Sequence, residues 1–256
     1  MARPRLSSIR WAEHERRCLI VLRAALTLLS EQTTGPGEDD INRDLYCCIR
    51  AAHAASRDGA TLPPVVYECR NAPSPRDQKR ATREFKRPDF QWGLFDDQAR
   101  PEDAYKHFVI ECKRLAPSPR GRRMYAKLYI SDGVLRFVSP KHAYGKDAES
   151  GTMVGYLQQD LSVDDALTGV NARAAGRKVP ALALSHRDGD RAAHLEHRLA
   201  RDFAVSPYRL SHLWVRVSDQ APTGAKGATG KQPRRPRSRR SPPAPSPRRR
   251  PPRRRP

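Results

Sequence analysis

The sequence predicts an α/β fold followed by a disordered basic C-terminal tail. Apolar residues recur every three or four positions in two N-terminal stretches, a period typical of helices. Short β-branched or aromatic runs lie between polar segments farther along, a pattern typical of strands. From residue 219 onward the chain is mostly Gly, Pro, Ser and Arg, which bury too little apolar area to offset the entropy of ordering.

The charge is divided unevenly along the chain. Of the formal net charge of +21, residues 219–256 contribute +12 and residues 1–218 contribute +9. A basic globular part suits a polyanionic partner, because Lys and Arg neutralise phosphates. The composition and the expected elements divide the chain into an N-terminal helical segment (1–37), a globular domain (38–218) and the tail (219–256). The tail is expected either to hold nucleic acid nonspecifically or only to add solubility.

Cysteine usage and hydropathy indicate the compartment. The five cysteines are odd in number and form no CxxC pair, so we expect buried free thiols in a reducing compartment rather than zinc ligands. No run of about 18 apolar residues is present, and we expect no membrane-spanning helix. Arg23 interrupts the segment that is nearest to a signal sequence, which predicts a cytoplasmic location.

Two helices are expected at the N-terminus. The first covers 11–31 and ends before a TTGPG run. The second begins near Glu38, where three consecutive acids suit the positive end of the helix dipole, and stops near Asp58-Gly59. Glu38 shares a stripe, at spacings of three and four, with Ile41, Leu45 and Cys48. We therefore expect its side chain to face inward.

Three strands are expected next, at 65–69 (VVYEC), 88–95 (PDFQWGLF) and 106–113 (KHFVIECK). The third is the clearest, because its residues alternate between two faces. One face would hold Phe108, Ile110 and Cys112, and the other Val109, Glu111 and Lys113.

The C-terminal half of the domain should return to helix and strand. Residues 122–138 fit a helix, which we favour over a hairpin closed by Asp132-Gly133. A strand is expected at 153–158, followed by a helix from Val163 to Ala175 that Ser162 caps and Gly176 closes. A last strand is expected at 212–217.

Three histidines near the end of the domain are expected to be structural. His194 and His197 would lie three apart on a solvated helix surface and hold no metal. His212 would be a polar group near the start of the last strand.

Three residues of the expected strands have the chemistry of a hydrolytic metal site. Asp89 begins the second strand, whereas Glu111 and Lys113 share one face of the third. In an antiparallel hairpin the two carboxylates would lie side by side at its open end, with the twenty-one residues between them as the loop. Two or three carboxylates near a phosphate suffice for Mg²⁺. A lysine beside them can orient or help deprotonate water and offset charge on the phosphate.

Pro88-Asp89, followed by Glu111-Cys112-Lys113 within an apolar strand, resembles the signature of the PD-(D/E)xK, or restriction-endonuclease-like, nuclease superfamily. The order of elements over roughly 38–158 is also similar: a helix opening with an acid, three strands, a helix and a strand. The resemblance implies a mixed sheet flanked by helices, with Asp89, Glu111 and Lys113 as the catalytic set. It implies Mg²⁺, or Mn²⁺ in its place, as cofactor, and a further carboxylate ligand from the first helix, which Glu38 matches.

Other residues could contribute to such a site. Asp39 or Asp40 could supply the acid of the helix instead of Glu38, and Glu68 is a reserve ligand. Gln158, at the end of a strand, could contact a phosphate or a base edge of a nucleic acid.

The sequence thus predicts a metal-dependent nuclease that hydrolyses phosphodiester bonds, with DNA as the favoured substrate and restriction or defence as a setting. The alternative is a non-catalytic nucleic-acid-binding protein on the same fold. In that case Glu111 and Lys113 form only a solvated strand face or an ion pair, and the basic surface and tail bind. Cutting both strands of a duplex often requires two active sites, which a homodimer would supply.

Overall fold

The structure, a computed structural model, describes residues 6–71, 78–101, 104–116 and 123–219, all within the unit Met1–Ala221. The helices are α1 (Leu6–Ser30), α2 (Glu38–Ala55), α3 (Arg80–Arg83), α4 (Arg123–Leu128), α5 (Leu135–Val138) and α6 (Val163–Ala175), with a 3₁₀ turn η1 (Gly59–Thr61) and a π-helical segment η3 (Tyr129–Val134). The strands are β1 (Thr33–Thr34), β2 (Val66–Tyr67), β3 (Phe90–Phe95), β4 (Tyr105–Leu115), β5 (Ser150–Leu157), β6 (Ala183–Asp188), β7 (Ala192–Leu199), β8 (Tyr208–Arg216) and β9 (Ser218–Asp219).

Seven of the strands form one mixed sheet in the order β2-β3-β4-β5-β8-β7-β6, while β1 and β9 pair separately. Its centre is parallel, because β5 pairs in parallel with both β4 and β8. Antiparallel hairpins extend it on either side, through β3 and β2 at one edge and through β7 and β6 at the other. The expected α/β class, with a mixed sheet flanked by helices, is confirmed.

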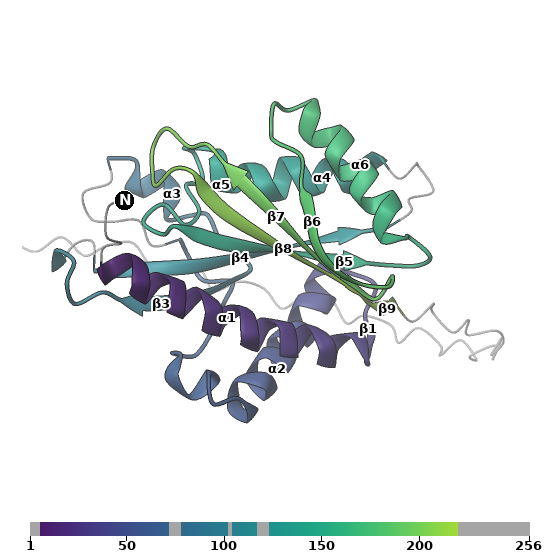
Figure 1. Cartoon of the computed structure of the whole chain (residues 1–256), viewed down its shortest axis with the longest axis horizontal. Coiled ribbons are helices and arrows are strands. Elements are labelled where there is room, and N and C mark those ends of the chain that lie inside the picture. Colours follow the sequence, from purple (N-terminus) through teal and green to yellow (C-terminus); the bar gives the residue numbers. More distant parts are fainter. Residues whose placement is uncertain (1–5, 72–77, 102–103, 117–122, 220–256) are drawn as a thin grey trace, which may run out of the picture. The chain divides into compact units, whose positions relative to one another are not determined.

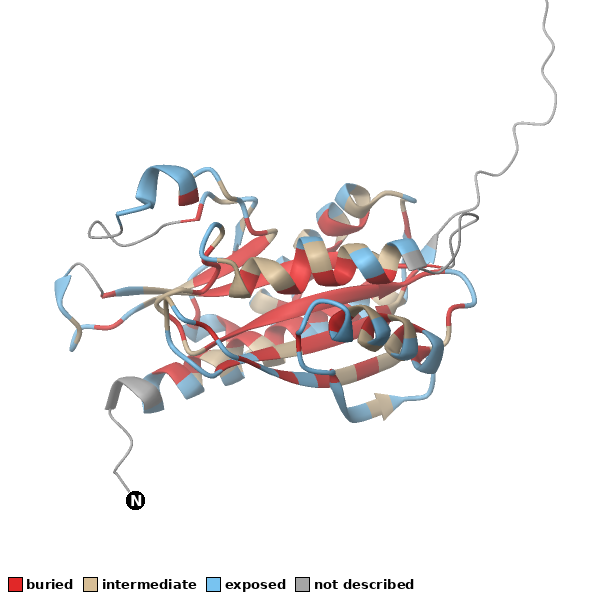
Figure 2. Cartoon of the chain, turned by 90° about the horizontal axis from the view of Figure 1, so that it is seen from above, coloured by how far each residue is buried: buried red, intermediate tan, exposed pale blue. Residues whose placement is uncertain are grey.

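Helices cover both faces of this sheet (Figure 1). One apolar cluster joins α1 and α2 to one face, and a second joins α4, η3 and α6 to the other. All eight residues of β5 are buried, as expected for a central parallel strand covered on both sides. Figure 2 shows this layering, with buried residues running along the central strands and on the sheet-facing sides of the helices.

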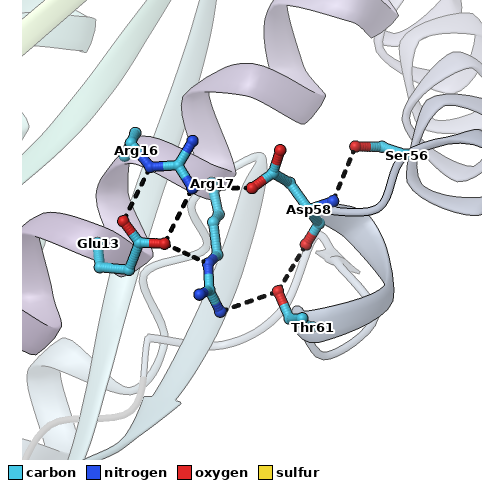
Figure 3. Close-up of polar contacts among 6 residues, drawn as sticks. All are labelled: Glu13, Arg16, Arg17, Ser56, Asp58 and Thr61. Carbon is cyan, nitrogen blue, oxygen red and sulfur yellow. Dashed lines mark hydrogen bonds and ion pairs between the residues drawn. The ribbon is translucent and has the colours of Figure 1, made fainter.

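A network of polar contacts ties α1 to the turn that follows α2 (Figure 3). Glu13 accepts from Arg16 Nε at 2.8 Å and from Arg17 Nε at 2.7 Å, and these bonds lower the pKa of Glu13 to about 2. The two arginines reach across to Asp58 and Thr61, each at 2.9 Å. Exposed pairs of this kind contribute little individually, so the network adds only modestly to stability.

Most of the expected elements are present. The helix expected at 11–31 is α1, the strand expected at 106–113 is β4, and those expected at 153–158 and 212–217 are β5 and β8. Residues 123–138 are helical throughout, so the hairpin alternative at Asp132-Gly133 is wrong. Ser162 caps α6 by accepting from Asp165 N at 3.1 Å, as expected.

Other expectations were wrong. His194 and His197 lie on strand β7 rather than on a helix, where a spacing of three puts them on opposite faces. His212 is fully buried within β8 rather than near its start. The strand expected at 65–69 is only two residues long. Cys47 is exposed, although Cys18, Cys48 and Cys112 are buried as expected and all five thiols are free.

Two expectations concern membranes and the tail. Among the described helices, none combines the length and the apolar character needed to cross a bilayer. The disorder expected at 219–256 falls, apart from Asp219, outside the described residues.

Candidate active site

The antiparallel pairing of β3 with β4 brings Asp89 opposite Glu111. Phe90 pairs with Ile110, and Asp89 comes immediately before Phe90, so the next step of the register aligns the two acids. They lie at the open end of the hairpin, as predicted. The loop is much shorter than the twenty-one residues expected, because β3 and β4 extend through most of that interval and only 96–104 connect them.

The faces of β4 are as predicted from its alternation. Phe108, Ile110 and Cys112 belong to the apolar cluster beneath α1 and α2. Val109 and Leu115 belong to the opposite cluster. Glu111 and Lys113, lying between these two in the alternation, therefore face α4, η3 and α5.

Glu38 reaches the site from the first residue of α2. Its Oε1 accepts from Lys113 Nζ at 2.7 Å, and its Oε2 accepts from the backbone nitrogen of Arg114 at 3.2 Å. The expectation that Glu38 faces inward is confirmed, and its partner is the predicted catalytic lysine. Of the other acids, Asp39 and Glu68 are exposed, and Asp40 bonds instead to Gly37 and Arg43.

Glu111 is the most deeply buried group of the site, with none of its surface exposed. Its Oε1 lies 2.9 Å from Lys113 Nζ and 2.5 Å from Arg136 Nη1. Its Oε2 is also buried and has no hydrogen-bond partner among the described residues. Burial and the nearby Asp89 raise the pKa of Glu111 to about 8, although Lys113 and Arg136 act in the opposite direction.

Asp89 is held by a backbone group of β4 and a side chain of α2. Its Oδ2 accepts from the backbone nitrogen of Cys112 at 2.6 Å, and its Oδ1 accepts from Asn42 Nδ2 at 3.2 Å. Tyr156 fixes that amide by donating to Asn42 Oδ1 at 2.7 Å. Burial raises the pKa of Asp89 to about 6, against the lowering effect of Lys113 and the amide of Cys112.

Lys113 remains a cation in this setting. Burial disfavours its charged form, but Glu111, Asp89 and Glu38 outweigh that effect and raise its pKa well above the usual range. Its Nζ also donates to the carbonyl of Cys112 at 2.7 Å. A lysine that keeps its proton at neutral pH can orient a water molecule or offset phosphate charge, and it cannot act as a general base.

Arg136 is a site residue that the sequence did not reveal. It comes from α5, directly after the π-helical segment η3, and a π turn is a frequent feature of functional sites. Gly133 in that segment lets the backbone approach β4 and β5 closely, because a Cβ there would lie 2.4 Å from Met153 Cε and 3.4 Å from Lys113 Cγ. A π turn accommodates an additional residue, so α-helical spacing counted from α4 would place Arg136 on a different side of the helix.

Gln158 follows β5 and is fully buried. Its Oε1 accepts from Arg114 Nε at 2.5 Å, while its Nε2 has no partner among the described residues. The Arg114 guanidinium also lies over the ring of Tyr125, 5.3 Å from its centroid. Gln158 thus lies near the site through Arg114 and makes no contact with Asp89 or Glu111 among those described.

The donor set fits a hard divalent cation in part. Among the described residues no group of three or more His, Cys, Asp and Glu side chains is placed to hold a metal ion, and Lys113 Nζ bonds to both Glu38 and Glu111. Asp89 and Glu111 nevertheless adjoin, and the buried Oε2 of Glu111 lacks a partner. Mg²⁺ is often held by only one or two carboxylates together with waters and substrate phosphates, so these two acids suit it.

A separate hollow of about 730 Å³ lies between α1 and the strands β6, β7 and β8. Its lining includes Arg23, His194 and Trp214 and none of the predicted site residues. We place the candidate chemistry at the carboxylates rather than at this hollow, because buried groups that perturb one another's pKa are typical of functional sites. No family model matches the chain, and neither the curated proteins nor the solved structures contain a match.

Proposed function

We propose that the protein is a metal-dependent nuclease of the PD-(D/E)xK, restriction-endonuclease-like kind that hydrolyses phosphodiester bonds of DNA. The observation that carries the proposal is Glu111: a fully buried carboxylate, beside Asp89, with one oxygen bound by two cations and the other without a described partner. Burying such a group is costly unless it binds something. The basic charge of residues 1–218 supports a nucleic-acid substrate.

Each residue of the site has a distinct role in this proposal. Asp89 and Glu111 would hold Mg²⁺ or Mn²⁺, and Glu38 would keep Lys113 in place through its 2.7 Å bond. Lys113 would orient the attacking water and offset the charge that develops on the phosphate. The bound ion would supply Lewis-acid polarisation of the phosphoryl oxygen.

The test is cleavage of supercoiled plasmid by the full-length protein with Mg²⁺ or with EDTA. We expect nicking that requires Mg²⁺ and that falls at least about a hundredfold in Asp89→Asn and Lys113→Met, the usual effect of removing one electrostatic group from an active site. Lys106→Met is the matched control. It removes a lysine from the same strand whose partner, 2.9 Å away, is Asp96 outside the site.

Two outcomes would contradict the proposal. Absence of Mg²⁺-dependent cutting in a folded parent protein is one, and a Lys113→Met variant that cuts as well as the parent is the other. Circular dichroism and thermal unfolding of each variant would show that a loss of cutting does not come from a loss of fold.

The alternative, a non-catalytic nucleic-acid-binding protein on the same fold, is favoured by one observation. Oε1 of Glu111 already lies within 2.9 Å of two cations, Lys113 and Arg136, an arrangement that a purely structural ion cluster would also have. Such a protein would bind DNA equally well in Mg²⁺ and EDTA and cut in neither. Its affinity would fall steeply with salt, because phosphate contacts release counterions.

A further inference from the structure

A basic segment lies immediately before Asp89 in the chain. Residues 79–87 contain five Lys or Arg and one acid, and they include the short helix α3. Most of these side chains are exposed or half-exposed, with the exception of Arg83. A cationic segment that leads directly into a site residue is suitably placed to guide a polyanion toward that site.

Hydrogen bonds connect this segment to the turn that follows α5, the helix that carries Arg136. The buried Arg83 donates through Nε to the carbonyl of Pro140 at 2.9 Å. Asn71 Nδ2 donates to the carbonyl of His142 at 2.9 Å, and the backbone nitrogen of Asn71 donates to the carbonyl of Lys86 at 2.7 Å. These bonds hold the segment and the turn together as one surface beside the carboxylates.

Cations from three elements gather at this place. Burial lowers the pKa of His142 and the nearby cations Arg136, Lys86 and Lys141 act in the same direction, which together brings it to about 4. Lys141 adjoins His142 in the chain, and Asn71 donates to the carbonyls of both His142 and Lys86, which brings Lys86 to the same turn. The positive surface therefore continues from the segment before Asp89 to the arginine that contacts Glu111.

Phe85 is the unusual member of the surface. Its ring is 68% exposed, more than any other large apolar residue described, and the guanidinium of Arg70 lies 5.5 Å from its centroid. A phenylalanine so exposed contributes little to a core. An aromatic ring among cations is the combination by which proteins bind single-stranded nucleic acid, since unpaired bases stack on the ring and phosphates contact the cations.

We propose that this surface binds single-stranded nucleic acid, with an unpaired base stacked on Phe85 and phosphates held by Arg70, Lys86, Arg87 and Lys141. The inference rests on the proposed function, because it supplies the substrate class of the same site. A base within an intact duplex cannot present its face to Phe85. The preferred substrate is therefore a single strand, or a duplex that is locally open.

The experiment measures binding to fluorescein-labelled single-stranded and duplex DNA of the same sequence by anisotropy, in EDTA, with full-length protein. We expect Phe85→Ala to weaken binding to the single strand about tenfold, as for the loss of one stacked base, and to leave duplex binding unchanged. Phe85→Trp should preserve the affinity, whereas Phe85→Leu, apolar but not aromatic, should lower it as Ala does.

Phe95→Ala is the matched control. Phe95 is 59% exposed and lies at the far end of the β3–β4 hairpin from Asp89, beside Tyr105, so its removal should leave binding unchanged. Because the C-terminal tail is present in every variant, its nonspecific binding is common to all. The variant Lys86→Ala/Arg87→Ala should lower the slope of log affinity against log salt by about 0.7 for each phosphate that the protein no longer neutralises.

A second readout locates the base directly. Irradiation of an oligonucleotide containing 5-iodouracil should crosslink it to Phe85, as identified by mass spectrometry of the peptide. Equal loss of affinity in Phe85→Ala and Phe95→Ala, or an effect of Phe85→Ala on duplex as large as on single strand, would overturn the proposal. Because binding is measured without metal, it can hold even if cleavage is never observed, and the two proposals fail separately.

Discussion

Replacing Arg136 by leucine should destabilise the protein in a way that depends on pH. Arg136 is one of two cations on the Oε1 atom of the buried Glu111, at 2.5 Å. Opposite charges with centres about 4 Å apart attract by about 4 kcal/mol at an effective dielectric constant of about 20. Because about 1.4 kcal/mol moves a pKa by one, Glu111 in the variant should keep its proton well beyond the pH at which the parent loses it.

The sign of the effect follows from proton binding. The pKa of Glu111 rises from 4.5 to about 8 on folding, so between these values the folded protein binds one proton more than the unfolded chain. Stability therefore falls by about 1.4 kcal/mol for each pH unit. The decline ends near pH 8 in the parent and continues in Arg136→Leu. The difference in unfolding free energy between them should widen by about 2 kcal/mol from pH 8 to pH 9.5.

Urea unfolding at pH 7, 8 and 9.5, followed by circular dichroism, measures this difference. In a Glu111→Gln background, where no carboxyl is left to titrate, the same Arg136→Leu change should cost an equal amount at all three values. A difference that stays constant with pH in the parent background would refute the reasoning. A difference that widens equally with Gln at position 111 would refute it too.

Three further predictions concern the support of the site and the core. Asn42→Ala removes a hydrogen-bond partner of both Asp89 and the buried Tyr156 hydroxyl. It should lower the unfolding free energy by about 1–3 kcal/mol, the cost of an unsatisfied buried group. Mg²⁺-dependent cutting should fall as well. Burial lowers the pKa of His212 well below its usual value, so its contribution to stability should be fully present above pH 6.5 and decrease as the pH falls below it. Urea titrations from pH 6.5 to 4.5 should therefore show a shallower decline of the unfolding free energy in His212→Asn than in the parent. An unchanged slope would contradict this. Gly155→Ala would place a Cβ 2.4 Å from Trp214 Cδ1 and should cost about 1–3 kcal/mol by overpacking, measured by thermal unfolding; a loss below about 0.5 kcal/mol would show that the indole can move.

The sequence was most informative where one local pattern decided the outcome. Alternation in β4 correctly assigned Glu111 and Lys113 to one face, because residues two apart in a strand cannot do otherwise. The apolar stripe of α2 correctly predicted that Glu38 faces inward, because residues three and four apart share one face of a helix. The partnership of Glu38 with Lys113 was not foreseen, since it depends on where the end of α2 meets the end of β4 in three dimensions.

The errors arose where the local pattern was ambiguous or absent. In β7, buried and exposed residues alternate along AAHLEHRL, but alanine and histidine are not typical of strands, and the spacing of His194 and His197 resembled a helix. The sequence did not indicate Arg136 as a site residue, because the direction of its side chain depends on the π turn that precedes it. Asn42 was overlooked because an amide on a helix becomes informative only when Asp89 and Tyr156 lie on either side of it.

The π-helical segment makes the site sensitive to chain length as well as to side-chain chemistry. Each residue advances an α-helix by about 100° around its axis, and a π turn accommodates an additional residue within a helix. Deletion of one residue between Tyr129 and Val134 would allow ordinary α-helix and rotate Arg136 away from Glu111, with every charged group of the site still present. Point substitutions sample side chains alone, so a library of single-residue deletions is what would expose this dependence.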